Sequence, residues 1–159
     1  MYRIGTGFDV HAFKQGNKLY LCGIEIPFDK SLAGHSDADV ALHALTDAIL
    51  GALALGDIGL HFPDTDKKWE KADSMIFLNW SIEQAKQRNL ELSNIDLTII
   101  CEKPKISIFR EQLIANLSKI CSLEHDKINV KATTTERLGF TGREEGIASI
   151  CSILLYETN

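Results

Sequence analysis

Runs of β-branched and other apolar residues alternate along this chain with longer segments in which apolar residues recur every three or four positions. The first pattern is typical of strands and the second of amphipathic helices. The predicted strands are 2–5, 18–26, 95–101, 128–134 and 147–156, and the predicted helices are 37–55, 72–88 and 108–121. Ser36 is the predicted N-cap of the first helix. Intermingled strands and helices favour an α+β fold, an α/β sandwich with helices on one face of a mixed, four-stranded type of sheet.

A chain of 159 residues is long enough for one domain with a real core, so 1–159 is expected to form a single domain. The net charge of −5 argues against nucleic-acid binding through bulk charge. No apolar run approaches the roughly 18 residues of a membrane span, and no signal peptide is visible at the start. The cysteines, Cys22, Cys101, Cys121 and Cys151, form no CxxC pair. We expect buried free thiols and a cytoplasmic location.

Three side chains form a candidate metal centre. Asp9 and His11 are two residues apart, so in an extended segment both leave the same face. His43 lies in an otherwise apolar helical pattern, where it shares a face with Asp39 and Asp47. One carboxylate and two imidazoles suit zinc and leave a coordination position open. Asp47 could accept a hydrogen bond from the nitrogen of the His43 imidazole that does not bind the metal. From spacing alone, a structural core role for His43 remains the alternative.

Three further polar segments are candidates for substrate binding. In 131–137, threonine hydroxyls could bind phosphate and Glu136 a hard cation such as Mg²⁺, although threonine is also ordinary strand filler. In 139–143, the guanidinium of Arg143 could bind a phosphate group. The alternative is that this segment is only a surface hairpin. The predicted loop 56–69 is long and rich in Asp, which suits polyol hydroxyls or Mg²⁺ as well as an ordinary turn.

Taken together, these segments resemble the 2-C-methyl-D-erythritol 2,4-cyclodiphosphate synthase family of the non-mevalonate route to isoprenoids. The resemblance covers nearly the whole chain in family order. The matching stretches are Arg-Ile-Gly-x-Gly-Phe-Asp-Val-His-Ala-Phe at 3–13, the segment from His35 to Asp47, Gly-Asp-Ile-Gly at 56–59, Phe-Pro-Asp-Thr-Asp at 62–66, Ala-Asp-Ser at 72–74 and the segment from Asn129 to Arg143.

The resemblance implies an intramolecular phosphoryl transfer. In 4-diphosphocytidyl-2-C-methyl-D-erythritol 2-phosphate, the 2-phosphate would attack the β-phosphorus, release CMP and close the cyclic diphosphate, with catalysis resting on positioning and charge neutralisation. A rival hypothesis is a zinc-dependent nucleotide diphosphate hydrolase, in which water attacks. Another is a non-catalytic module that binds isoprenoid diphosphates.

The resemblance also implies roles for individual residues. Asp9, His11 and His43 would hold Zn²⁺, and Glu136 would hold Mg²⁺ or Mn²⁺. His35 and Thr134 are the implied catalytic residues. The implied substrate-binding residues are Ser36, then Asp57, Ile58, Gly59, Phe62, Pro63, Asp64, Thr65 and Asp66 for the methylerythritol part, then Cys101, Glu102, Lys103, Pro104, Lys105, Ile106, Ser107, Thr133 and Thr135 for cytidine, and finally Phe140 and Arg143 near a trimer axis.

The assembly implied by the resemblance is a homotrimer, with sheets around a central axis and active sites between subunits. Three positions depart from the family pattern. Thr6 stands where many members have His, and Lys71 and Glu144 stand where Gly is frequent. Glu144 adds a negative charge near the implied axis, which weakens the expectation that isoprenoid diphosphates bind there.

Overall fold

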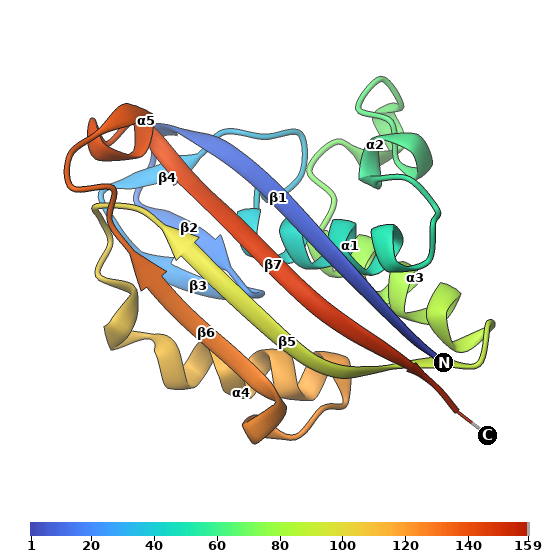
Figure 1. The fold of residues 1–159 in the computed structure, drawn as a ribbon. Helices are drawn as coiled ribbons and strands as arrows, with labels where there is room; N and C mark the ends of the chain where they lie inside the picture. The colour runs from blue at the N-terminus through green and yellow to red at the C-terminus, as the bar shows by residue number, and fades with distance from the viewer. Residues whose placement is uncertain (159) are drawn as a thin grey trace.

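The computed structural model describes residues 1–158. Within them, one mixed sheet has the strand order β4-β1-β7-β5-β6 (Figure 1). Its strands are β1 (Tyr2–Gln15), β4 (Lys30–Leu32), β5 (Leu90–Ile100), β6 (Ile128–Thr133) and β7 (Gly146–Glu157). Strand β7 pairs antiparallel with both β1 and β5, whereas β5 and β6 run parallel. The predicted α+β fold is confirmed, but the four-stranded sheet is wrong, because β4 adds a fifth strand at the β1 edge.

The long helices all lie on one face of the sheet, behind it in Figure 1. They are α1 (Val40–Ala52), α3 (Ser74–Lys86) and α4 (Arg110–Cys121). A hairpin of β2 (Lys18–Leu21) and β3 (Ile24–Pro27) lies on the same side. The core fills the space between these layers, where Leu42, Ile49 and Leu97 have no exposed surface. The shorter elements are α2 (Ile58–His61), α5 (Gly139–Gly142) and 3-10 turns at Lys67–Trp69, Ile106–Ile108 and His125–Lys127.

Helix α1 packs directly on the backbone of β1. A Cβ at Gly5 would lie 1.8 Å from the carbonyl oxygen of Ala48, and one at Gly7 would lie 2.0 Å from that of Ala44. Only glycine permits so close an approach of strand and helix. The Gly-x-Gly pattern therefore sets the position of α1 against β1.

Asp39 corrects the predicted start of the first helix. That helix begins at Val40, and the Asp39 side chain caps it by accepting a hydrogen bond from Leu42 N at 3.0 Å, so Ser36 is not the N-cap. The same carboxylate accepts hydrogen bonds from the backbone of Cys22 at 3.0 Å and Gly23 at 2.6 Å. These two residues form the turn, with φ of 52° and 75°, that divides the predicted strand 18–26 into β2 and β3.

The face of the sheet that points away from the helices carries exposed apolar side chains. Strand β1 alternates, so its even-numbered residues lie on this face. Ile4 is 76% exposed and Phe8 56% exposed, and Tyr2, Val10 and Ile150 are exposed beside them. Exposed apolar patches of this kind occur at protein–protein interfaces, membrane-contact sites and ligand-binding grooves.

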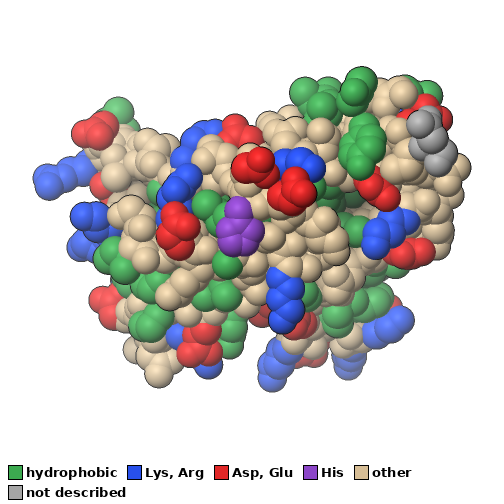
Figure 2. Space-filling view, turned by 90° about the horizontal axis from the view of Figure 1, so that it is seen from below, with side chains coloured by type: hydrophobic (Ala, Val, Ile, Leu, Met, Phe, Trp, Pro, Cys, Tyr) green, Lys and Arg blue, Asp and Glu red, His purple; other side chains and the backbone are tan. Residues whose placement is uncertain are grey.

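Charges elsewhere are mixed. On the face seen in Figure 2, the acidic and basic side chains of the described residues are interspersed and form no continuous patch of one sign. All four cysteines are buried and free, as predicted. Among residues 1–158, no helix combines the length and the apolar character that crossing a membrane would require.

Candidate functional site

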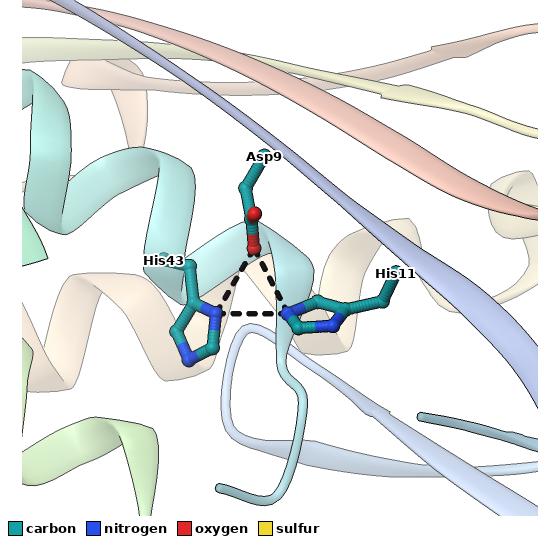
Figure 3. A group of neighbouring side chains, drawn as sticks. All are labelled: Asp9, His11 and His43. Carbon is teal, nitrogen blue, oxygen red and sulfur yellow. Dashed lines mark hydrogen bonds and ion pairs between the residues drawn. The ribbon is translucent and has the colours of Figure 1, made fainter. Parts of the chain in front are cut away.

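Asp9, His11 and His43 meet in one group, as predicted (Figure 3). Asp9 Oδ2 lies 2.9 Å from His43 Nδ1 and 3.0 Å from His11 Nε2. The two ring nitrogens are 3.0 Å apart. Three potential ligand atoms thus form a small triangle, with the carboxylate and one imidazole from β1 and the second imidazole from α1.

The local fold explains why these three side chains converge. Residues 9 and 11 are odd-numbered positions of β1, and their side chains face α1. His43 lies in the first turn of α1, next to Ala44, whose carbonyl group contacts the β1 backbone at Gly7. The close strand–helix contact therefore brings the third ligand atom to the first two.

The second nitrogen of each imidazole is also engaged. His11 Nδ1 lies 2.7 Å from the carbonyl oxygen of Ala33, which can only accept, so this nitrogen carries the hydrogen. His43 Nε2 lies 2.8 Å from Ser74 Oγ and 3.1 Å from Ser36 Oγ. The prediction that Asp47 holds this imidazole is wrong, because its carboxylate instead accepts a hydrogen bond from Ile58 N at 2.8 Å.

Electrostatics favour an ionised carboxylate at this centre. Burial raises the pKa of Asp9, but hydrogen bonds and positive charge from His11 and His43 outweigh it and hold that pKa well below its usual range. Burial lowers the pKa of His11, but the hydrogen bond and the charge of Asp9 outweigh burial, so that this pKa is raised overall. One carboxylate and two imidazoles with anchored second nitrogens are a donor set that fits a divalent transition metal.

A cavity of about 350 Å³ adjoins the metal-ligand triangle. It is lined by His11, His35, Ser36, His43, Ile58, Gly59, Phe62, Pro63, Asp64, Trp69 and Phe77. Most of these were predicted to bind substrate. The His35 side chain is 70% exposed, and its Nε2 is 3.9 Å from Asp64 Oδ2.

Three residues predicted to bind substrate beside this cavity do not line it. Asp57 caps α2 by accepting from Leu60 N at 2.9 Å, and Asp66 caps the following 3-10 turn by accepting from Lys68 N at 3.0 Å. Thr65 lies between the lining residues and this cap. The two aspartates therefore shape the loop through its backbone.

Two aromatic residues that line the cavity were missed. The ring of Phe62 lies 4.9 Å from that of Trp69 and 4.7 Å from that of Phe77. Such aromatic pairs prefer tilted and edge-to-face packing. In the sequence, the spacing of Phe77 in α3 indicates only a core position, and Trp69 gives no signal.

A second cavity, of about 320 Å³, lies at the ends of β5 and β6. It is lined by Cys101, Glu102, Pro104, Lys105, Ile106, Ser107, Ala132, Thr133 and Thr134. These are nearly all of the residues predicted for cytidine. Lys103 is outside it and pairs with Glu144 at 3.3 Å, and Thr135 Oγ1 donates to the carbonyl oxygen of Leu138 at 2.6 Å.

The predicted second metal ligand belongs to this second group. Thr134 Oγ1 donates a hydrogen bond to Glu136 Oε1 at 3.1 Å. The two cavities share no lining residue, so His35 and Thr134, the two predicted catalytic residues, line different cavities of one chain. Within residues 1–158, therefore, no single cavity contains the whole predicted site.

The two residues predicted near a trimer axis lie at and just after α5. Phe140 is 39% exposed. Arg143 Nε and one terminal nitrogen donate to the two carboxylate oxygens of Glu145, at 2.8 Å and 3.2 Å. The guanidinium is exposed, and in this chain its partner is a carboxylate.

Comparison with known proteins gives a consistent result. The model of the YgbB family matches residues 2–156. The chain is 52% identical over 155 residues to the 2-C-methyl-D-erythritol 2,4-cyclodiphosphate synthase of Cereibacter sphaeroides, covering 98% of each chain. It is 58% identical to the bifunctional enzyme IspD/IspF of Paracoccus denitrificans, covering 96% of this chain and 40% of that protein.

The structural comparison agrees. The complex of Plasmodium falciparum IspF with CDP superimposes with a TM-score of 0.88 at 35% identity, covering 99% of this chain and 97% of that one. The chain spans about two fifths of the length of the bifunctional relatives that it matches.

Proposed function

Because this chain belongs to the YgbB family of 2-C-methyl-D-erythritol 2,4-cyclodiphosphate synthases, we propose that it converts 4-diphosphocytidyl-2-C-methyl-D-erythritol 2-phosphate to the 2,4-cyclodiphosphate and CMP. The observation that carries this proposal is the triangle of Asp9, His11 and His43 beside a cavity. The triangle provides ligands for a metal with an open position, and the cavity provides room for a phosphorylated polyol.

The reaction rearranges phosphate within one molecule. An oxygen of the 2-phosphate forms a bond to the β-phosphorus, the bond from that phosphorus to the CMP oxygen breaks, and CMP leaves with its electron pair. Asp9, His11 and His43 would hold Zn²⁺, and Glu136 would hold Mg²⁺ or Mn²⁺. These ions, when bound, supply positive charge that neutralises the phosphate oxygens.

The cavity beside the triangle suits the methylerythritol phosphate. Its wall is apolar at Phe62 and Phe77, while Ser36 and the exposed His35 offer hydrogen-bond donors. Ordered donors next to an apolar wall can orient a polyol phosphate and exclude water. We assign His35 to the phosphate on these grounds.

The second cavity suits the cytidine. Residues 101, 102 and 104–107 line it, and so do Thr133 and Thr134, which carry hydroxyls. Backbone donors and acceptors can read the edge of a base, and hydroxyls can bind the ribose or a phosphate oxygen. In the Plasmodium falciparum relative, CDP is the ligand of the complex, which supports a nucleotide here.

A homotrimer would bring the two cavities together. The metal-ligand triangle and the cytidine cavity are separate within one chain. The sheet face that carries Ile4 and Phe8 is exposed and apolar, and it could pack around a three-fold axis. We therefore propose that each active site pairs one chain's triangle with its neighbour's cytidine cavity. Light scattering should then give three times the mass of one chain.

Product analysis by ³¹P NMR tests the proposed reaction. The expected products are CMP and a cyclic diphosphate. A linear product without the cyclic diphosphate would contradict the proposal and support the hydrolase hypothesis. Unchanged substrate, together with tight binding of isoprenoid diphosphates, would instead support the non-catalytic module.

A further inference from the structure

We propose that Ser74 and Asp37 form a hydrogen-bonded relay that orients the imidazole of His43 for metal binding, so that both are positioning residues of the metal centre. This inference rests on the proposed function. Ser74 lies in the Ala-Asp-Ser stretch at 72–74, for which neither the metal-ligand triangle nor the two cavities require a role.

The relay has a direction. A carboxylate only accepts hydrogen bonds, so the hydroxyl of Ser74 donates its hydrogen to Asp37 Oδ1. The lone pairs of Ser74 Oγ are then free to face His43 Nε2, which is 2.8 Å away. Nε2 must therefore carry the hydrogen. In the neutral imidazole that binds a metal, His43 Nδ1 then keeps its lone pair, on the side of Asp9 Oδ2, which is 2.9 Å away.

Asp37 is itself held in place. Its Oδ2 accepts a hydrogen bond from Ser74 N, and its Oδ1 accepts one from Asp39 N, both at 3.2 Å. Its own backbone N–H donates to the carbonyl oxygen of Ala72 at 3.1 Å. Ser74 has no exposed surface. Ser74 is therefore buried, Asp37 is half-buried, and hydrogen bonds fix both side chains, which is what a positioning role requires.

Ser36 is the competing partner of His43. Its Oγ lies 3.1 Å from Nε2 and accepts a hydrogen bond from Ala38 N at 3.1 Å. Its own hydrogen can be donated to the imidazole or to Ser74 Oγ, which is 3.5 Å away. Ser74 is nearer, and its hydrogen is committed to Asp37, so it is the stronger acceptor for the Nε2 hydrogen.

The two imidazoles of the centre are anchored by different groups. His11 donates to the backbone carbonyl of Ala33, which no substitution removes. His43 depends on a side chain, which a substitution does remove. A substitution at Ser74 can therefore measure how much the hydrogen bond to His43 contributes to the metal affinity.

The test is the zinc affinity of Ser74→Ala, measured by competition with a chromophoric chelator. The expected result is a loss of about 10- to 100-fold relative to the unmodified chain. Ser81→Ala is the matched control, because Ser81 is a buried serine of the same helix whose hydroxyl donates to the Leu78 carbonyl at 2.8 Å. Its zinc affinity should not change. CMP affinity should stay constant in both variants, since Ser74 does not line the cytidine cavity.

Asp37→Asn provides a second test that leaves Ser74 in place. The amide oxygen still accepts from the hydroxyl but without the full negative charge, so the zinc affinity should fall by less than in Ser74→Ala. The relay is refuted if Ser74→Ala, folded as judged by its melting temperature, binds zinc as tightly as Ser81→Ala. If Ser74→Ala does not fold, unchanged zinc affinity in Asp37→Asn refutes it. Absence of zinc binding by the unmodified chain would instead overturn the metal centre of the proposed function, and the relay with it.

Discussion

At the residue scale, Glu136 is the least protected of the predicted metal ligands. It is exposed, its φ is 53°, and its carboxylate accepts a hydrogen bond from Thr134 Oγ1. We expect Glu136→Gln to raise the Mg²⁺ concentration that gives half-maximal activity by at least about tenfold, since losing a charged ligand costs more than losing an outer partner. A titration of activity against Mg²⁺ measures this.

The control for Glu136→Gln is Glu124→Gln, an exposed glutamate that pairs with Lys127 at 2.9 Å. That change should leave the titration unaltered, and the zinc content of both variants should stay constant. An unshifted Mg²⁺ titration in Glu136→Gln would count against a role in cation binding.

The buried thiols make a second prediction at the residue scale. Burial raises the pKa of Cys121 to about 12, and burial with the nearby charge of Glu102 raises that of Cys101 to about 12, from an ordinary 9.0. Above pH 9 the unfolded chain loses these protons first, so the folded state binds more protons and becomes less stable as pH rises. We expect a loss of about 1 kcal/mol per thiol between pH 8 and 10.

Urea unfolding at the two pH values measures this loss. Cys121→Ala should show a shallower decline than the unmodified chain. In the native protein at pH 8, alkylation should be slow, and all four cysteines should react once urea unfolds the chain. Rapid labelling of the folded protein would show that the thiols are accessible and would contradict the prediction.

At the element scale, the contact between β1 and α1 predicts a large effect of one methyl group. A Cβ in Gly7→Ala would lie 2.0 Å from Ala44 O and 2.7 Å from Ala48 N. Helix and strand would have to separate, at a cost of about 3 kcal/mol or more. Because His43 and Asp9 lie on the two separated elements, zinc affinity should fall together with the free energy of unfolding.

Gly51→Ala is the matched control for Gly7→Ala. Gly51 is also in this contact region, but a Cβ there meets nothing nearer than Thr6 O at 3.9 Å. Alanine favours helix over glycine by about 1 kcal/mol, so this change should stabilise the protein slightly. Equal stabilities of the two variants in urea would show that the close approach is not as tight as described.

Sequence patterns predicted the type of each long element better than its ends. Alternation placed Asp9 and His11 on one face, as observed. The predicted strand 18–26 was wrong because its turn at Cys22 and Gly23 is stabilised by Asp39, a residue from another element. Strand β4 was missed because Lys30–Leu32 is too short to show a pattern. Each error depends on a tertiary contact that has no local signal.

The family resemblance supplied what local patterns could not. From spacing alone, the simpler interpretation of His43 is a core residue, and nothing in the spacing relates it to residues on β1. At two of the departures from the family pattern, the backbone explains why glycine is the usual residue. Lys71 and Glu144 stand where Gly is frequent, and their φ values of 60° and 56° are in the left-handed region that favours glycine.

At the scale of the whole molecule, the division of the site between two cavities predicts complementation between chains. His43→Ala should inactivate the metal half, and Thr134→Ala the nucleotide half. In the proposed homotrimer, assemblies that contain both variants should regain about a third of the unmodified activity, because one of three interfaces pairs two intact halves. Co-expression with two different tags, followed by purification on both, isolates these mixed trimers for assay.

The matched control combines His43→Ala with Asp9→Ala. Both changes damage the same half, so no interface in a mixed trimer contains an intact metal centre, and the trimer should remain inactive. Recovery of activity in this control, or none in the first combination, would refute the shared site.

The contact of α1 with β1 at Gly5 and Gly7 has a consequence for how freely this molecule can vary. Peptide groups have no alternative rotamers, so a spacing set by main chain against main chain does not respond to changes in the volume of neighbouring side chains. Substitutions that accumulate elsewhere in the core would shift helices and strands by small amounts and leave the ligand spacing nearly constant. Most of the chain can therefore accumulate substitutions without changing the distances between Asp9, His11 and His43.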